Sequence, residues 1–303
     1  GQTTVSAGTL KLSDTAGFLS NIDNSATVEL YSSGNWQFGT YNHVITGSGT
    51  YVKTGTGVVR FKNVVATPSG QINVQAGTLS NDYNSCYWAG STASMDIASG
   101  ATFDMRADAV KVNALTGSGS ITNSYGSNGT DILTVNSGEF TGTVLGSGDG
   151  VLGAGRGKIG ITKTGSGTLI LSGDNTYSGA TTVVAGVLNI RHANALGGTT
   201  EGTVVADGAA LETQGGITTA AEPLTINGSG ISSGGALRNV SGDNTFAGAI
   251  TLGSASRINS DAGTLTLNSG TALSGAYGLT FGGAGNVTAS SVIATASLTK
   301  DGS

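Results

Sequence analysis

Charge is scarce in this sequence of 303 residues, where Asp, Glu, Lys and Arg together make up only 10%. Globular domains usually contain about 25% of these residues. The net charge of −5 is spread along the chain without a basic run, which argues against nucleic acid or an anionic membrane surface as a partner. No apolar run approaches the roughly 18 residues that a membrane-spanning helix needs, so we expect no membrane insertion by this segment.

Proline and cysteine are almost absent as well. Pro68 and Pro223 are the only prolines, which argues against a collagen-like or proline-rich disordered chain. Cys86 has no second cysteine with which to form a disulfide, and we interpret it as a small buried hydrophobic side chain rather than a reactive thiol. Because hydrophobic residues still make up 37% of the chain, it can build a core, and we reject disorder.

Glycine is abundant, at 52 residues, and it separates short apolar runs. In the run TLIL, Leu169 and Leu171 fall on one face while Thr168 and Ile170 fall on the other, which is the period of two that a strand requires. Gly, Ser, Asn and Asp between the runs are typical turn residues. No run reaches helical length, so the sequence predicts an all-β chain of short strands with tight corners.

Two kinds of segment repeat along the chain, and internal repeats indicate a stacked architecture. Residues 53–61 (KTGTGVVRF) match residues 163–171 (KTGSGTLIL) without a gap. Residues 1–10 and 70–79 both match residues 179–188. The like motifs recur at separations of 69 and 110 residues, which suit several coils of roughly 20 to 25 residues each.

A sandwich, a propeller and a parallel β-helix are all built from short strands with glycine corners. Corners of varying length between repeated motifs argue against hairpin folds, which favour two-residue turns. We therefore predict a solenoid of about 13 parallel coils. No linker interrupts the repeats, so residues 1–303 are expected to form one continuous β-helix. Because the sequence starts and stops inside a repeat, we expect a segment of a longer chain.

A set of apolar residues is predicted to point into this stack. They are Leu10, Leu12, Val28, Leu30, Val59, Phe61, Leu79, Leu169, Leu171, Leu188, Ile190, Leu265 and Leu267. The outward positions are expected to hold Thr, Ser, Asn and Lys. Stacked Thr and Asn side chains can form hydrogen bonds from coil to coil, which would make a surface poor in charge tolerable.

Residues 163–190, KTGSGTLILSGDNTYSGATTVVAGVLNI, resemble the passenger-associated (autotransporter-associated) β-strand repeat. Residues 3–12, 243–267 and 297–303 resemble the same repeat. The resemblance implies a right-handed, single-stranded parallel β-helix in the passenger of a large secreted protein of Gram-negative bacteria. Such passengers are typically exported through an outer-membrane domain and serve as adhesins, stalks or scaffolds. After Phe61 the first repeat continues with KNVVATPS where the second has SGDNTYSG, so we expect a different corner there.

A search for chemistry finds one acidic cluster, formed by Asp96, Asp104 and Asp108 with Arg106. Glycoside hydrolysis needs two carboxyl groups roughly 5 to 10 Å apart, and nothing in the spacing of these residues makes them converge. Calcium needs about six to eight oxygen ligands, and only three acidic residues are present here. We therefore interpret them as strand-edge and turn residues, with a metal site as the weaker alternative, and we predict no catalytic residue and no cofactor.

Aromatic residues are concentrated early in the chain, with eleven of the seventeen before residue 104. Two groups stand out, the first with Tyr31, Trp36, Phe38 and Tyr41 and the second with Tyr83, Tyr87 and Trp88. Exposed aromatic rings stack on sugars and anchor protein interfaces, so these are the candidate ligand contacts. The competing interpretation is that they fill wide coils.

These observations favour a non-enzymatic extracellular rod or scaffold of an autotransporter-type surface protein, such as an adhesin or a filament segment. The candidate partners are a glycan, a host or bacterial surface protein, and a second copy bound end to end or side by side. The alternative from a different class is a β-helix polysaccharide lyase or hydrolase, which turnover of a polysaccharide would reveal.

Overall fold

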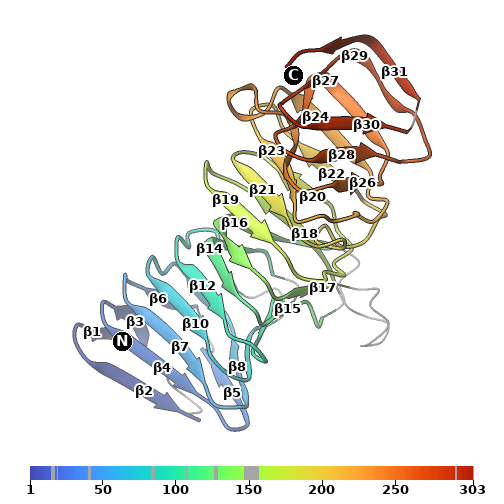
Figure 1. Ribbon diagram of the computed structural model, residues 1–303. Coiled ribbons are helices and arrows are strands. Elements are labelled where there is room, and N and C mark those ends of the chain that lie inside the picture. Colours follow the sequence, from blue (N-terminus) through green and yellow to red (C-terminus); the bar gives the residue numbers. More distant parts are fainter. Residues whose placement is uncertain are drawn as a thin grey trace. The chain divides into compact units, whose positions relative to one another are not determined.

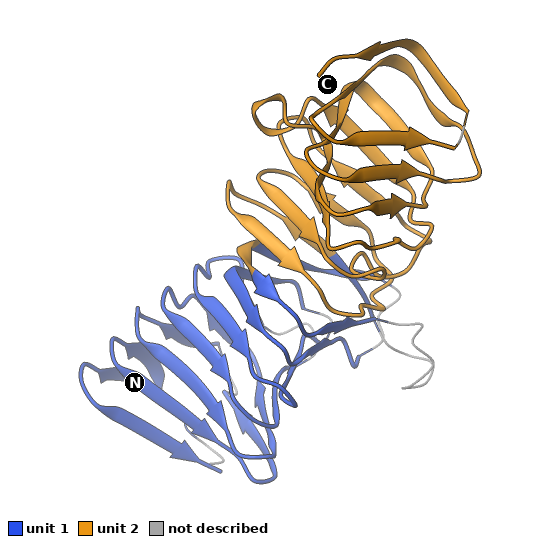
Figure 2. Ribbon diagram, in the orientation of Figure 1, with its two compact units in different colours: residues 1–135, 139–160 blue, residues 136–138, 161–303 orange. Residues whose placement is uncertain are grey.

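The computed structural model describes residues 1–14, 18, 20–39, 42–82, 86–106, 108–125, 129–146, 157–290 and 292–302. These residues form a parallel β-solenoid of about 12 turns, and the only helix among them is the single 3₁₀ turn η1 (Ile231–Ser233) (Figure 1). The chain divides into two compact units (Figure 2). Unit 1 comprises residues 1–135 and 139–160, and unit 2 comprises residues 136–138 and 161–303.

The coils of unit 1 contribute short strands to three parallel sheets. The first sheet contains β1 (Gln2–Val5), β3 (Asn21–Asn24), β6 (His43–Thr46) and β9 (Val64–Ala66). The second contains β2 (Thr9–Ser13), β4 (Thr27–Tyr31), β7 (Thr50–Thr54), β10 (Gln71–Val74), β12 (Ser94–Ile97) and β14 (Val110–Gly117). The third contains β5 (Asn35–Phe38), β8 (Val58–Phe61), β11 (Thr78–Asn81), β13 (Thr102–Asp104), β15 (Ser120–Thr122) and β17 (Thr143–Leu145).

Unit 2 repeats this arrangement. One series contains β18 (Lys158–Lys163) from Ile161 on, β20 (Thr181–Val183), β22 (Thr203–Val205), β24 (Leu224–Gly228), β27 (Ile250–Ser260), β29 (Leu273–Gly282) and β31 (Ile293–Lys300). A second contains β19 (Thr168–Leu171), β21 (Val187–Ile190), β23 (Ala210–Gln214) and β25 (Leu237–Ser241), and it also meets β27. The third contains β26 (Asn244–Phe246), β28 (Thr264–Leu267) and β30 (Asn286–Ala289). β16 (Thr130–Phe140) carries residues of both units.

The pairing register confirms the predicted stacking of coils. Leu169 pairs with Leu188, and Leu188 pairs with Leu211 one coil further on, always in parallel strands. All three side chains are completely buried, as expected when each coil covers the apolar face of the next. Every strand pairing that the structure describes is parallel, so the hairpin-built alternatives are excluded.

The predicted core residues are buried with one exception. Leu12 is 7% exposed and the later members of the set are at most 3% exposed, but Leu10 is only half-buried. Leu10 lies on β2, which pairs with β4 on one side. With a neighbouring coil described on that side alone, Leu10 has less apolar surface to pack against than the leucines further along the unit.

The prediction that lysine points outward is wrong at the two repeated motifs. Alternation along β7 places Lys53 on the same inward face as Tyr51, and Lys163 lies inward on β18 in the same way as Ile161. Lys53 is 1% exposed and Lys163 is completely buried. Several asparagines that were expected on the surface are also buried, among them Asn189.

Both buried lysines bind backbone carbonyl oxygens at a corner. The Nζ atom of Lys163 donates to the carbonyl oxygens of the two following residues, at 2.7 and 2.9 Å, and to that of Ala185 on the next coil, at 2.9 Å. Lys53 repeats the arrangement at 2.8 and 2.8 Å, with Ala76 at 2.9 Å. Burial lowers the pKa of each amine to about 8. Three carbonyl acceptors favour the ammonium form, so each lysine holds two coils together as a cation at neutral pH.

Glycine is required where neighbouring corners meet. Gly186 has φ of +70°, and a Cβ atom there would clash with the backbone oxygens of Gly165 and Gly167 in the preceding coil. Only glycine combines that backbone angle with so close an approach. A Cβ atom on Gly165 or Gly167 would likewise clash with Asn136 or Ser137, so the Gly-x-Gly pattern of the repeat is also explained by close contact between coils.

The corner after the first motif differs from the second, as predicted. After Phe61 the chain passes through Asn63, with φ of +52°, directly into strand β9. The corresponding corner after Leu171 contains no strand. There Tyr177 is completely buried and its hydroxyl lies 2.6 Å from the Oγ1 atom of Thr181.

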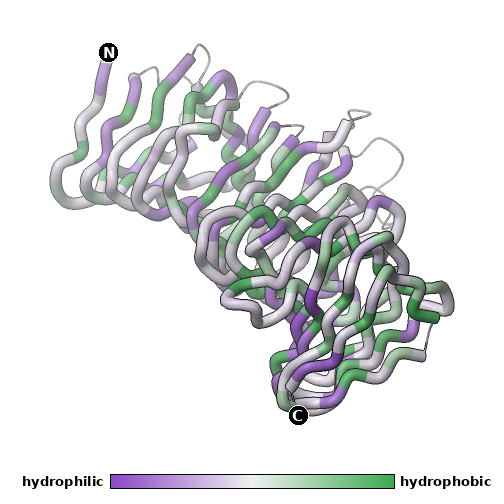
Figure 3. Tube along the Cα trace, turned by 90° about the horizontal axis from the view of Figure 1, so that it is seen from above, coloured by the Kyte–Doolittle hydropathy of each residue, from purple (hydrophilic) through white to green (hydrophobic). Residues whose placement is uncertain are grey.

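Hydrophobic and hydrophilic residues lie close together along the chain, and burial alternates along individual strands such as β7 and β19. Figure 3 shows strongly hydrophobic and strongly hydrophilic residues interspersed along the chain, with pale stretches between them. No helix in the described part of the chain is long and apolar enough to cross a membrane.

Candidate functional site

Most of the predicted aromatic contacts are core residues of unit 1. Trp36 and Phe38 on β5 are 3% and 1% exposed, and Trp88 is 1% exposed. Their rings form part of an internal stack in which Phe61 lies 5.5 Å from Phe38 and 6.4 Å from Trp88 between centroids. Trp88 also packs edge-on against Phe103 at 5.8 Å. The burial of Trp36, Phe38 and Trp88 favours the competing interpretation, that these rings fill wide coils.

Two of the remaining candidates reach the surface. Tyr31, at the end of β4, is half-buried, and the Nζ atom of Lys11 lies 4.6 Å from the centroid of its ring. Lys11 also forms an ion pair of 2.8 Å with Glu29. The ring of Tyr87 is 61% exposed. Tyr41 and Tyr83 lie outside the residues that the structure describes.

The backbone at Tyr87 is held by a parallel bridge to Val65. The amide of Tyr87 donates to the carbonyl oxygen of Val64 at 2.9 Å, and its carbonyl accepts from the amide of Ala66 at 2.8 Å. Side chains alternate along an extended segment, so Cys86 and Trp88 point inward while Tyr87 points outward. The predicted burial of Cys86 is confirmed, at 5% exposure.

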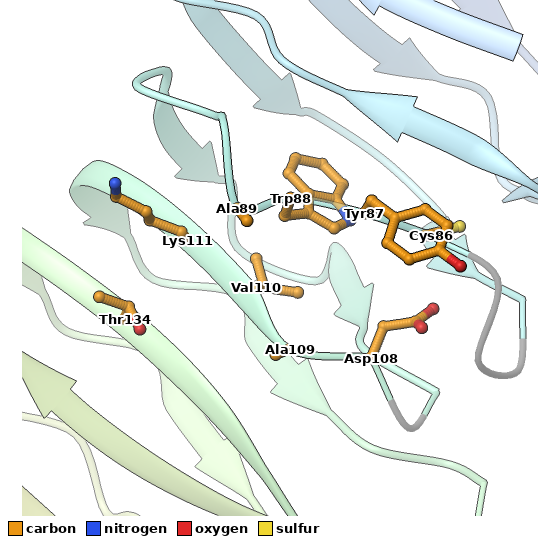
Figure 4. Close-up of a pocket in the computed structure, with 9 residues that line it drawn as sticks. All are labelled: Cys86, Tyr87, Trp88, Ala89, Asp108, Ala109, Val110, Lys111 and Thr134. Carbon is orange, nitrogen blue, oxygen red and sulfur yellow. The ribbon is translucent and has the colours of Figure 1, made fainter. Parts of the chain in front are cut away.

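A hollow of about 480 Å³ opens beside Tyr87 within unit 1. Figure 4 shows its lining residues, which come from the segment around Trp88, from the start of β14 and from β16. Tyr87 and Asp108 lie toward one end of the hollow, whereas Lys111 and Thr134 lie toward the other (Figure 4). We call this feature the Tyr87 hollow. Its volume lies within the range of about 300 to 1,000 Å³ that small-molecule sites occupy.

Small side chains create the space. Ala89 and Ala109 are both exposed and both line the hollow, between larger neighbours. Val110 is buried and Lys111 is exposed, because β14 alternates between its two faces. The result is a mainly apolar surface with polar groups at its ends.

The acidic cluster does not assemble into one site. Asp96 on β12 accepts a hydrogen bond of 2.6 Å from the Oγ1 atom of Thr116. Asp104 on β13 accepts bonds from the amide and the hydroxyl of Ser124, at 2.9 and 2.5 Å. Asp108 lies at the Tyr87 hollow. Among the described residues, no group of three or more His, Cys, Asp or Glu side chains is placed to hold a metal ion.

Arg106, the cation of that cluster, also has structural partners. Its Nη2 atom lies 3.8 Å from the Oδ1 atom of Asp82, and its guanidinium lies 5.4 Å from the ring centroid of Tyr125. Asp96, Asp104 and Arg106 therefore act in packing between coils, and the hollow is a feature of unit 1 that is open to a ligand. The sequence signal for it was the alternation Cys86-Tyr87-Trp88, which predicts one outward ring between two inward side chains.

The geometry defines the class of protein first. The protein is a β-solenoid built of structural repeats. The corner lysine and the glycines of the repeated motif stack one coil on the next. Comparison with protein families then gives the kind of repeat. The passenger-associated-transport-repeat model matches residues 52–80 and 161–190, so the chain carries the repeats that are typical of autotransporter passenger domains. Searches of curated proteins and of solved structures found no match.

The two matched segments coincide with the two corner-lysine motifs, and each extends through the following strands to β11 and β21. Repeats of this kind imply a secreted or cell-surface location in Gram-negative bacteria. They are usually structural. The chain is thus an autotransporter passenger-type β-solenoid.

Proposed function

We propose that this chain is a non-enzymatic extracellular scaffold that acts as part of an adhesin, holding a binding surface outside the cell. The observation that carries the proposal is the use of the repeat itself. Lys163 is buried against three carbonyl oxygens, and Gly186 is needed for contact with the preceding coil. The distinctive residues of the motif are thus used for stacking and are not available for chemistry. We extend the proposal to residues 1–303 as one continuous, right-handed β-helix.

The acidic residues support a scaffold over a lyase or hydrolase. Such an enzyme needs carboxyl groups and cations gathered on one face, about 5 to 10 Å apart for hydrolysis. Asp96 and Asp104 instead bind hydroxyl and amide groups of neighbouring coils. Their hydrogen bonds join neighbouring coils and stabilise the stack.

The test is to incubate the chain with a panel of neutral and acidic polysaccharides, with and without calcium, and to measure new reducing ends and unsaturated products. We expect no turnover with any polymer. A parallel assay displays the chain on a Gram-negative cell through an autotransporter export domain and measures retention of the cells on surfaces coated with the same polymers. Turnover would contradict the scaffold, and displayed chains that give no retention on any surface would contradict the adhesin role.

A further inference from the structure

We infer that the Tyr87 hollow is a binding site for an acidic sugar, a pyranose ring that carries a carboxylate. The inference rests on the proposed adhesin function and names the chemical class of its ligand. Three properties of the hollow support it: an exposed aromatic ring at its edge, an apolar floor, and groups of opposite charge toward opposite ends.

The aromatic ring supplies the first contact. Tyr87 is the most exposed aromatic side chain in the described part of the chain, at 61%, although its backbone is fixed by the bridge to Val65. A ring held in this way offers an apolar face and a hydroxyl group at little further cost in conformational entropy. The C–H face of a pyranose packs on such a ring.

The floor of the hollow suits a flat ligand. Ala89 and Ala109 are small, and Val110 is buried beneath the surface, so a ring can approach the backbone of β14 closely. Apolar floors with a few polar groups at the edges are typical of small-molecule sites, in which the polar groups fix the orientation of the ligand.

The polar groups determine which sugar fits. Asp108 precedes Lys111 by three residues, so their Cα atoms are separated by at most about 10 Å of extended chain. Asp108 is only 5% exposed, and the edge of its carboxylate that lines the hollow accepts hydrogen bonds from sugar hydroxyls. The exposed ammonium of Lys111 pairs with a carboxylate toward the other end, which Thr134 also lines. Because the two charges lie toward opposite ends of the hollow (Figure 4), an acidic ring fits with its carboxylate at Lys111 and its hydroxyls at Asp108.

Binding of defined oligosaccharides to the full chain tests the inference. One pair of probes is trigalacturonate and its methyl ester, and the other is sialyllactose and lactose. We expect one of the two acidic probes to bind about tenfold more tightly than its uncharged counterpart, and added salt to reduce that difference. The two pairs distinguish a uronic acid from a sialic acid as the source of the carboxylate.

Variants locate the site. Tyr87→Ala and Lys111→Gln are each expected to weaken binding of the preferred acidic probe by about tenfold, whereas Tyr87→Phe keeps the ring and most of the affinity. Tyr277→Ala, at an exposed tyrosine of unit 2, and Lys11→Gln, at an exposed lysine of β2, are matched controls that should bind as the unchanged chain does. Circular dichroism and the melting temperature establish that each variant is folded.

Any one of three results would overturn the inference. They are equal binding of the acid and its ester, binding that survives both Tyr87→Ala and Lys111→Gln, and no binding of either acidic probe. None of these results is evidence of turnover, so the proposal of a non-enzymatic scaffold would remain although the sugar site would be rejected. Cleavage of a probe would instead contradict the scaffold, even if the hollow binds it.

Discussion

The two units use one backbone plan but fill their interiors differently. Unit 1 contains an aromatic stack through Phe38, Phe61 and Trp88. Unit 2 has an aliphatic interior that also holds a buried polar network, in which the side-chain amide of Asn239 donates to Ser260 Oγ at 3.0 Å and to two backbone carbonyl oxygens. At the matched repeat position, Phe61 in unit 1 corresponds to Leu171 in unit 2. The coil thus tolerates either kind of filling, provided that the corner lysine and the glycines are kept.

The largest expected effect comes from emptying the aromatic stack. Phe61→Ala should destabilise unit 1 by about 3 to 5 kcal/mol, because it leaves a cavity and removes ring contacts with Phe38 and Trp88. Leu171→Ala, the matched change in unit 2, should cost less, about 2 to 4 kcal/mol, since it removes an aliphatic side chain of smaller area. Urea unfolding, monitored by hydrogen exchange in each unit, measures the loss in free energy of unfolding for both variants. An equal or larger loss at Leu171 would contradict the comparison.

The corner lysines should matter equally in both units. Lys53→Met and Lys163→Met each leave three buried carbonyl oxygens without their donor. The methionine no longer has the desolvation cost of a buried amine, and the net loss of stability should be about 3 kcal/mol. Hydrogen exchange at β8 and at β19 reports the two corners separately. Loss of hydrogen-exchange protection at one corner but not at the other would show that the buried lysine does not stabilise both corners in the same way.

A buried carboxyl group makes unit 2 sensitive to pH. Glu222 is 2% exposed, and burial raises its pKa from an ordinary value of 4.5 to about 7. Because the folded-state pKa is the higher one, this contribution to stability is complete below pH 4.5 and is lost as the pH rises through 7. The loss amounts to roughly 3 kcal/mol.

Glu222→Gln is the matched variant, because an amide keeps the size of the side chain and does not titrate in this range. For the unchanged chain, the urea midpoint of unfolding should be lower at mildly alkaline pH than at acid pH. The difference between the two midpoints should be smaller for the variant. A fall of the same size in both chains would assign the pH dependence to other groups.

The smallest of these effects is expected in the buried polar network of unit 2. Asn239→Ala removes an amide whose two N–H groups are shared among three acceptors, and it should destabilise unit 2 by about 2 kcal/mol. Asn227→Ala removes a single hydrogen bond of 2.9 Å to the carbonyl oxygen of Val205 and should cost about 1 kcal/mol. Thermal unfolding of the two variants gives the difference between their losses of stability. Equal losses would mean that the network at Asn239 stabilises unit 2 no more than one hydrogen bond does.

Sequence patterns predicted the fold because the glycine-separated strands and the repeated motifs agree on a period of roughly 20 residues. They also predicted the inward leucines. They failed at Lys53 and Lys163, where charge was taken as a sign of exposure although strand alternation places both lysines on the inward face with Tyr51 and Ile161. The carbonyl oxygens that bind them belong partly to the next coil, so no local pattern shows the compensation.

The candidate site was predictable only in part. The aromatic group that contains Tyr87 and Trp88 drew attention to the right segment, but its composition did not separate the one outward ring from the buried one. The hollow itself depends on Ala89 and Ala109, which come from different coils and lie together only in the folded chain. Right-handedness and continuity over residues 1–303 stay predictions.

The central claim is that neighbouring coils lie in register, and cysteine pairs in unit 2 test it most directly. Thr182 pairs with Val204 on the next coil, and Val204 pairs with Thr225 on the one after. Adjacent coils are about 4.8 Å apart, within the span of a disulfide, and second neighbours are about twice as far. In a Cys86→Ala background, Thr182→Cys with Val204→Cys should oxidise to a disulfide in the folded chain, and Thr182→Cys with Thr225→Cys should not. Cross-linking of the second pair, or none of the first, would contradict the stacked parallel coils.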